Sequence, residues 1–183
     1  MTDVHSSFTG PVTYFKRIPH HLWYAHAKKS IFLAWSSIWM NRIISSTEGS
    51  CPISSKRTRL IGQSIDHNVF KVAERTNSSA SKFIHVGRLD PSKNVIEIID
   101  VLNSTNFNGE KISLCLIGSP SSPKETSVLF RINDFVKKND ARWISILPRI
   151  SRDALPAKLI EFDCFIHAYR GSLDKVLIEA TMC

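Results

Sequence analysis

Residues 82–102 read KFIHVGRLDPSKNVIEIIDVL, and this stretch decides the fold class of the chain. Lys82 to Val86 is a short apolar run of the kind that forms a buried strand. From Asn94 to Leu102 the apolar residues recur at helical spacing, and Pro91 and Ser92 before them are typical of a helix start. A strand followed at once by a helix is one βα unit of a parallel sheet.

The second half of the chain repeats this pattern. Further strands are expected at Ile112 to Ile117, Trp143 to Leu147 and Phe162 to His167. Helical patterns run to about Lys138, from Ser151 to about Glu161, and from Leu173 to Met182. These alternations predict a parallel α/β domain. Because no Gly or Pro closes the last helix, the domain is expected to be truncated at its carboxyl end.

The first part of the chain predicts only a portion of another α/β lobe. Strands are expected at His21 to Ala25, Ile43 to Ser46 and Arg59 to Ile61, with an apolar helix near Ile31 to Met40. Ala73 to Ser79 is polar and typical of a loop between two lobes. We therefore divide the chain into residues 1–75, a partial amino-terminal lobe with its linker, and residues 76–183, the α/β domain.

The amino-acid composition and charge of the chain argue against several classes of protein. The chain has 183 residues, of which 43% are hydrophobic and 22% charged, as in ordinary globular proteins. No apolar run is long enough to span a membrane, and Met1 to Gly10 lacks the apolar centre of a secretory signal, so a cytoplasmic location is expected. The four scattered cysteines predict neither a zinc site nor disulfides. A net charge of +8 favours anionic partners, but no nucleic-acid-binding motif is present.

The first candidate site is the turn after the strand Lys82 to Val86. Ligands of parallel sheets bind at the carboxyl ends of the strands, where helix amino-termini favour anions. Arg88 and Lys93 add two positive charges to this turn, which suits a diphosphate. A pair of ordinary surface cations explains the spacing about equally well.

The second candidate site lies in residues 170–180, which read RGSLDKVLIEA. This stretch again runs from a strand end into a helix. The Glu179 carboxylate suits the vicinal hydroxyls of a ribose, and Ser172 and Leu173 stand where backbone N–H groups meet a phosphate. Taken alone, Glu179 is more simply explained as a solvent-facing helical residue, but its pairing with the first site favours a ligand-binding role.

These motifs together resemble a known family, the retaining glycosyltransferases of the GT-B fold, also called glycosyl transferases group one. The resemblance covers most of the chain. The matching segments are Val86 to Leu89 with Lys93, Leu114 to Gly118, Leu177 to Ala180, Ile44 to Ser46, and Ile61 to Asp66 with Phe70. It implies a Rossmann-like donor lobe, joined to part of an amino-terminal acceptor lobe.

The resemblance also implies a reaction. A sugar would pass, with retention of anomeric configuration, from a nucleoside diphosphate sugar to a sugar or lipid-linked acceptor in glycan biosynthesis. Arg88 and Lys93 would stabilise the departing diphosphate, so that no metal or other cofactor is needed, and His26 is a third catalytic candidate. The donor-binding candidates are Gly87, Gly118, Gly171, Ser172, Leu173, Asp174, Lys175 and Glu179. Peripheral contact with the inner face of a membrane is compatible with the positive charge.

One departure from the family and two alternatives stay open. Where the family has its first glutamate, which contacts the donor sugar, this chain has Gly171. Asp174 or Lys175 is the candidate to make that contact instead. A dinucleotide-dependent oxidoreductase is disfavoured because no Gly-x-Gly-x-x-Gly follows a strand. The other alternative is a truncated, non-catalytic nucleotide-sugar-binding remnant. The isolated chain is accordingly expected to bind such donors weakly or not at all.

Overall fold

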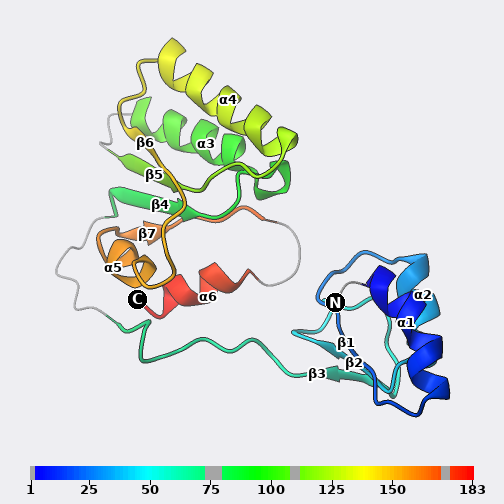
Figure 1. The fold of residues 1–183 in the computed structure, drawn as a ribbon. Helices are drawn as coiled ribbons and strands as arrows, with labels where there is room; N and C mark the ends of the chain where they lie inside the picture. The colour runs from blue at the N-terminus through cyan, green and yellow to red at the C-terminus, as the bar shows by residue number, and fades with distance from the viewer. Residues whose placement is uncertain (1–2, 73–79, 108–111, 170–173) are drawn as a thin grey trace. The chain divides into compact units, whose positions relative to one another are not determined.

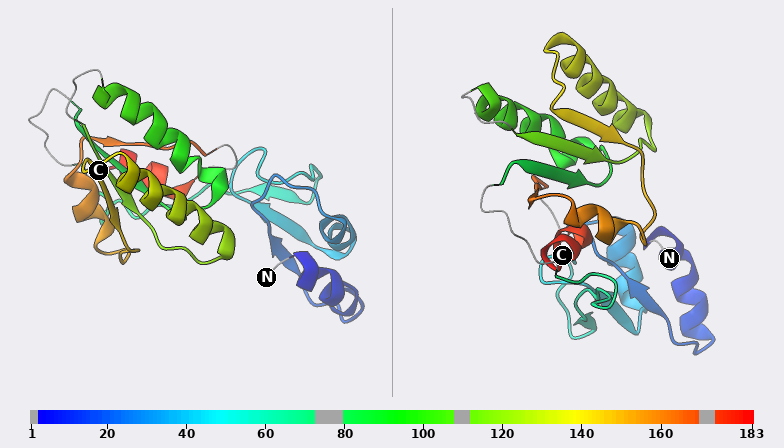
Figure 2. Two further views of the ribbon diagram at one scale, coloured as in Figure 1. Left: turned by 90° about the horizontal axis from the view of Figure 1, so that it is seen from above. Right: turned by 90° about the vertical axis from the view of Figure 1, so that its left-hand side faces the viewer.

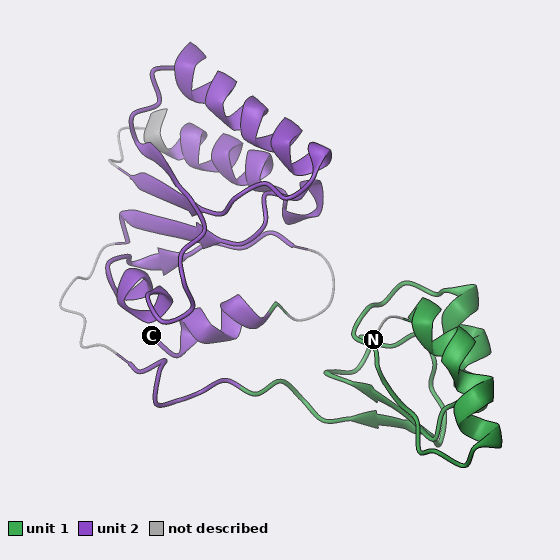
Figure 3. Cartoon of the chain, viewed as in Figure 1, with its two compact units in different colours: residues 1–64, 171–174 green, residues 65–170, 175–183 purple. Residues whose placement is uncertain are grey.

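The chain forms two compact units, coloured separately in Figure 3. The computed structural model describes residues 3–72, 80–107, 112–169 and 174–183. Of the described residues, those up to Ser64 and Asp174 belong to the first unit, and those of 65–169 and 175–183 belong to the second. The sequence predicts the division at residues 75 and 76, and the predicted linker Ala73 to Ser79 lies outside the described residues. Phe70, only 1% exposed, packs in the core of the second unit, so the contacts divide the chain earlier than the composition does.

The second unit is built on a four-stranded sheet. Its strands are β4 (Lys82–Val86), β5 (Ser113–Ile117), β6 (Ile144–Leu147) and β7 (Cys164–Phe165). They lie in the order β6-β5-β4-β7, and every pairing is parallel. The predicted parallel sheet is therefore confirmed. The chain places β5 and β6 on one side of β4 and then crosses to place β7 on the other.

Helices cover both faces of this sheet. They are α3 (Val95–Phe107), α4 (Pro123–Lys138), α5 (Leu155–Ile160) and α6 (Lys175–Thr181), with a short 3-10 helix, η1 (Pro91–Lys93). Leu114 and Leu116 pack with α3 and α4, whereas Cys115 and Ile117 pack with α5 and α6. Figures 1 and 2 show the two helix pairs on opposite sides of the strands. Burial of both faces explains why β5 is a continuous apolar run.

One helix start differs from the prediction. The sequence predicts a helix from Ser151, but α5 begins at Leu155. Ser151 Oγ accepts a hydrogen bond from the backbone N–H of Ala154 at 3.3 Å, within a turn. Because Pro156 has no N–H, it cannot donate the helical hydrogen bond that an earlier start would require.

The first unit contains a second parallel sheet. Its strands are β1 (His21–Trp23), β2 (Arg42–Ser45) and β3 (Thr58–Leu60), in the order β1-β2-β3. The predicted apolar helix is α2 (Ile31–Trp39), but α1 (Asp3–Phe15) was not predicted. The buried residues of α1 are Ser6, Ser7 and Gly10, so its packed face shows no apolar stripe. Among the described residues, no helix combines the length and apolar character that crossing a bilayer requires.

Asp163 fastens the start of β7 to the start of β4. Its Oδ2 accepts hydrogen bonds from the backbone N–H groups of Lys82 at 2.8 Å and Ser81 at 3.0 Å. These bonds hold the pKa of the Asp163 carboxyl below its ordinary value. We expect Asp163→Asn to lower the free energy of unfolding by about 1 kcal/mol at neutral pH.

The pH dependence of this effect follows from the direction of the shift. A depressed pKa contributes stability above the unfolded-state pKa, about 4, and this contribution is lost as the pH falls through the folded-state pKa. The difference between wild type and variant should therefore shrink below about pH 4. Urea unfolding across this range measures it, with Asp153→Asn, at an exposed position, as the control. A difference that is independent of pH would contradict the assignment.

Candidate functional site

The topology of the second unit marks one edge of its sheet as a binding site. All four strands are parallel, so their carboxyl ends meet at the same edge. β5 and β7 flank β4 on opposite sides, and the helices that follow β4 and β7, α3 and α6, pack on opposite faces of the sheet. In open α/β sheets a crevice forms outside the strand ends at such a switch point, and ligands bind there.

Two glycines bring the ends of β4 and β5 unusually close together. Gly87 donates from its backbone N–H to the carbonyl oxygen of Ile117 at 3.0 Å, and Gly118 donates to that of Leu147 at 3.1 Å. A Cβ atom on Gly118 would lie 2.1 Å from the Gly87 carbonyl oxygen, which no real side chain allows. A Cβ on Gly87 would come no closer than 3.6 Å to another side chain. Gly118 is therefore required by backbone packing, and its role in donor binding stays a prediction.

The turn after Gly87 is capped and tied to β7. The Asp90 carboxylate accepts hydrogen bonds from the hydroxyl and the backbone N–H of Ser92, and these bonds lower the pKa of Asp90. Asn94 takes the left-handed conformation, with φ of 51°, and its Nδ2 donates to the carbonyl oxygen of Ala168 at 2.7 Å. The turn between β4 and α3 thus lies against the segment that follows β7.

Lys93 lies in this contact. Its side chain is largely buried, with only 8% of the residue exposed. The Nζ atom lies 3.9 Å from the centre of the Tyr169 ring, a favourable cation–π arrangement. Because Lys93 belongs to the turn after β4 and Tyr169 to the segment after β7, the structure places a cation where the carboxyl ends of these two strands meet. Lys93 is not an ordinary solvent-facing surface cation.

Arg88 lies beside the start of α4. Its side chain is 68% exposed, and Nη1 lies 3.7 Å from Oε1 of Glu125. Glu125 is a buried residue of the first turn of α4, and its Oε2 accepts hydrogen bonds from the N–H and hydroxyl of Ser121 at 2.7 and 2.8 Å. Arg88 therefore keeps a largely solvent-facing guanidinium, with one terminal nitrogen near the buried Glu125 carboxylate.

Glu179 is buried in α6. Only 3% of the residue is exposed, so it is not the solvent-facing helical residue that its sequence also allowed. Its Oε1 accepts a hydrogen bond from Nη2 of Arg152 at 2.6 Å. A buried carboxylate needs such a partner, because an unpaired charge is strongly disfavoured away from water.

The other predicted site residues are less well placed. Gly171, Ser172 and Leu173 lie outside the described residues. Asp174 is half-buried, and the exposed Lys175 begins α6. Their proposed contacts with the donor stay predictions.

His26 belongs to the first unit, in the segment between β1 and α2. Its exposed ring meets the Tyr24 ring edge to face at 5.7 Å between centres. Its catalytic role also stays a prediction.

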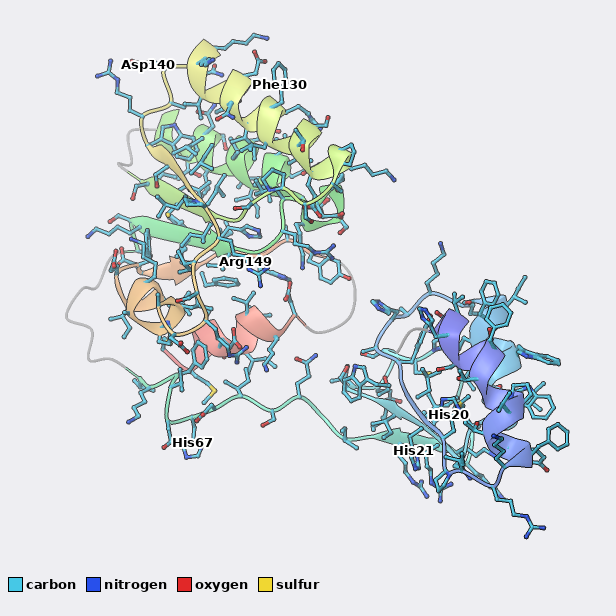
Figure 4. All side chains as sticks on the ribbon, in the orientation of Figure 1. His20, His21, His67, Phe130, Asp140 and Arg149 are labelled. Atoms are coloured by element: carbon cyan, nitrogen blue, oxygen red, sulfur yellow. The ribbon has the colours of Figure 1, made fainter. Side chains whose placement is uncertain are left out.

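No group of three or more histidine, cysteine or acidic side chains that could hold a metal ion occurs in the described ranges. His20 and His21, labelled in Figure 4, lie at the start of β1. The His20 Nδ1 lies 2.9 Å from the Thr13 hydroxyl, and burial lowers the pKa of His20. His20 therefore has a local structural contact. A metal-independent reaction stays a prediction.

Sequence reasoning missed the partners of the candidate residues. Arg152, Tyr169 and Glu125 contact Glu179, Lys93 and Arg88 respectively. None of these three carries a motif, and each is far from its partner in sequence. The only signal was position, because Arg152 and Tyr169 follow predicted strands.

Comparison with solved structures identifies known proteins that share the fold of this chain. No protein-family model and no curated protein sequence matches the chain. HepE from Anabaena, solved with UDP and glucose, matches with a TM-score of 0.81 and 15% identity over 100% of this chain and 55% of HepE. TarM from S. aureus matches with a TM-score of 0.71 and 13% sequence identity over 96% of this chain and 38% of TarM. Sucrose-phosphate synthase from Thermosynechococcus elongatus matches with a TM-score of 0.70 and 16% sequence identity over 95% of this chain and 51% of the synthase.

These three structures are GT-B glycosyltransferases, which confirms the predicted fold class. The chain has the GT-B-like arrangement of a Rossmann-like parallel sheet preceded by part of another parallel α/β unit. At identities this low, the likeness shows the fold alone. The chain spans about half the length of HepE and of sucrose-phosphate synthase.

Proposed function

We propose that the second unit binds the donor of a glycosyltransferase, a nucleoside diphosphate sugar. The observation that carries this proposal is the position of Lys93. This largely buried cation lies in the segment after β4 and contacts Tyr169 in the segment after β7. Anionic ligands of doubly wound sheets bind at this place. The shared fold supports the proposal, since HepE was solved with UDP and with UDP-glucose.

The proposed chemistry gives each candidate a role. Transfer breaks the bond between the anomeric carbon and the diphosphate oxygen, and the diphosphate leaves with added negative charge. Lys93 and Arg88 stabilise this charge electrostatically without a metal ion. Glu179 accepts hydrogen bonds from the ribose hydroxyls, and Gly87 and Gly118 let the backbone approach the ligand.

The remaining parts of the proposal concern the acceptor and the location. Transfer proceeds with retention to a sugar or lipid-linked acceptor held by the amino-terminal lobe, where His26 serves the reaction. We place the reaction in the cytoplasm, with peripheral contact at the inner face of the membrane when the acceptor is lipid-linked. The net charge of +8 supports contact with an anionic surface.

A second candidate function is a nucleotide-sugar-binding module without catalysis. Gly171, in place of the glutamate that contacts the donor sugar in the resembling family, favours it. Binding of donor without release of nucleotide would distinguish this module from the enzyme.

Nucleotide titration tests the proposal. In the 183-residue chain, UDP or GDP at up to millimolar concentration should shift the backbone amide signals of residues 87–94 in NMR spectra. Glu179→Gln should weaken this binding by about 10-fold or more, because a neutral amide replaces a charged acceptor. Glu97→Gln, at an exposed position of α3, is the matched control. Because the isolated chain is expected to bind the nucleotide weakly, shifts that map to other residues and spare residues 87–94 are the outcome that would refute the proposal.

A further inference from the structure

Glu179 has a partner that orients it. Arg152 Nη2 lies 2.6 Å from Oε1 of Glu179, a short, charge-assisted hydrogen bond. The Glu179 side chain is 5% exposed, whereas that of Arg152 is 52% exposed. The contact therefore joins a buried carboxylate to a cation that reaches the surface.

The guanidinium of Arg152 has a second contact. Its central carbon lies 5.5 Å from the centre of the ring of Phe70, which is 1% exposed. A planar guanidinium held by both an aromatic ring and a carboxylate has a restricted orientation. A lysine at position 152 would supply charge but not this geometry.

The loop that carries Arg152 begins at the ligand-binding edge of the sheet. It follows β6, whose carboxyl end meets those of β4 and β5. In the same loop, the backbone N–H of Arg149 donates to the Ser119 hydroxyl at 3.0 Å, which joins the loops after β5 and β6. Arg152 thus approaches Glu179 from the side of the strand ends.

We infer that Arg152 is a positioning residue, which holds the Glu179 carboxylate in the orientation that accepts hydrogen bonds from the ribose of the donor nucleotide. The inference rests on the proposed function and deepens it. It assigns to the nucleotide site a side chain that no sequence motif marks. If Arg152 served only to stabilise the fold, its replacement would not change how strongly the protein prefers a ribose to a deoxyribose. The experiment measures that preference.

The experiment removes one partner from the protein and one from the ligand. The affinities of UDP and of 2′-deoxy-UDP are measured by NMR titration for wild type, Arg152→Met, Arg152→Lys, Glu179→Gln and Arg149→Met in the full chain. Wild type should prefer UDP by about 10-fold, the effect of one hydrogen bond to a charged acceptor. The preference should fall nearly to unity in Arg152→Met and Glu179→Gln. Arg149→Met, at an exposed position of the same loop, should keep it.

The outcomes separate this inference from the proposed function. If Arg152→Met or the charge-conserving Arg152→Lys keeps the full wild-type preference for UDP, the inference is overturned while the proposed function stands. If wild type binds UDP without any preference, the ribose role of Glu179 fails, and the inference with it. If UDP binds wild type without shifting the amide signals of residues 87–94, the proposed donor site fails, and the inference falls with it. Arg152→Lys keeps a cation beside the buried carboxylate, so it serves as the test should Arg152→Met fail to fold.

Discussion

In a full-length protein that contains this chain, alanine in place of Lys93 is expected to lower the rate of the proposed glycosyl transfer by about 100-fold or more, with a smaller effect on donor binding. Lys93 is largely buried as a residue and its Nζ lies over the Tyr169 ring, so its charge is less screened by water than that of an exposed lysine. Negative charge grows on the diphosphate as it leaves, and the interaction is therefore strongest in the transition state. Arg88→Ala should act in the same direction but less strongly, because Arg88 is exposed and faces Glu125.

The measurement is the release of UDP or GDP from nucleoside diphosphate sugars, with water or a panel of sugars as acceptor. Both kcat and KM are needed. Lys124→Ala removes an exposed cation from the start of α4 and is the control. If Lys93→Ala raised KM and left kcat near that of wild type, its assignment to the leaving group would be wrong.

Gly118→Ala is expected to lower the free energy of unfolding by about 3 kcal/mol, a large effect for the addition of one methyl group. The new Cβ would lie 2.1 Å from the Gly87 carbonyl oxygen, and this neighbour is backbone, not the movable end of a side chain. Relief of the clash requires the ends of β4 and β5 to separate, although Gly87 N–H bonds to the carbonyl oxygen of Ile117 there.

Urea unfolding monitored by circular dichroism measures this loss. Gly87→Ala is a matched control at the neighbouring strand end, where the added Cβ meets its nearest side-chain atom at 3.6 Å, an ordinary contact. Its unfolding midpoint should stay close to that of wild type. Equal midpoints for the two variants would show that the strand ends do not approach as closely as described.

The strands and long helices of the second unit were predictable because their local patterns are strong. β4 is found at the predicted residues, and α4 ends at the predicted Lys138. Two predictions failed: α1 was missed because its packed residues are not apolar, and the start of α5 was placed too early. α1 packs through Ser6, Ser7 and Gly10, and the start of α5 is set by the missing N–H of Pro156.

The sequence by itself determined the fold class and the three charged candidates Arg88, Lys93 and Glu179, because strand-to-helix transitions and local charge are properties of neighbouring residues. Only the tertiary structure decided their surroundings. The burial of Glu179 against Arg152 and the contact of Lys93 with Tyr169 join residues that are distant in the chain. Such contacts arise from the strand order β6-β5-β4-β7, which depends on how whole elements pack and not on any local pattern.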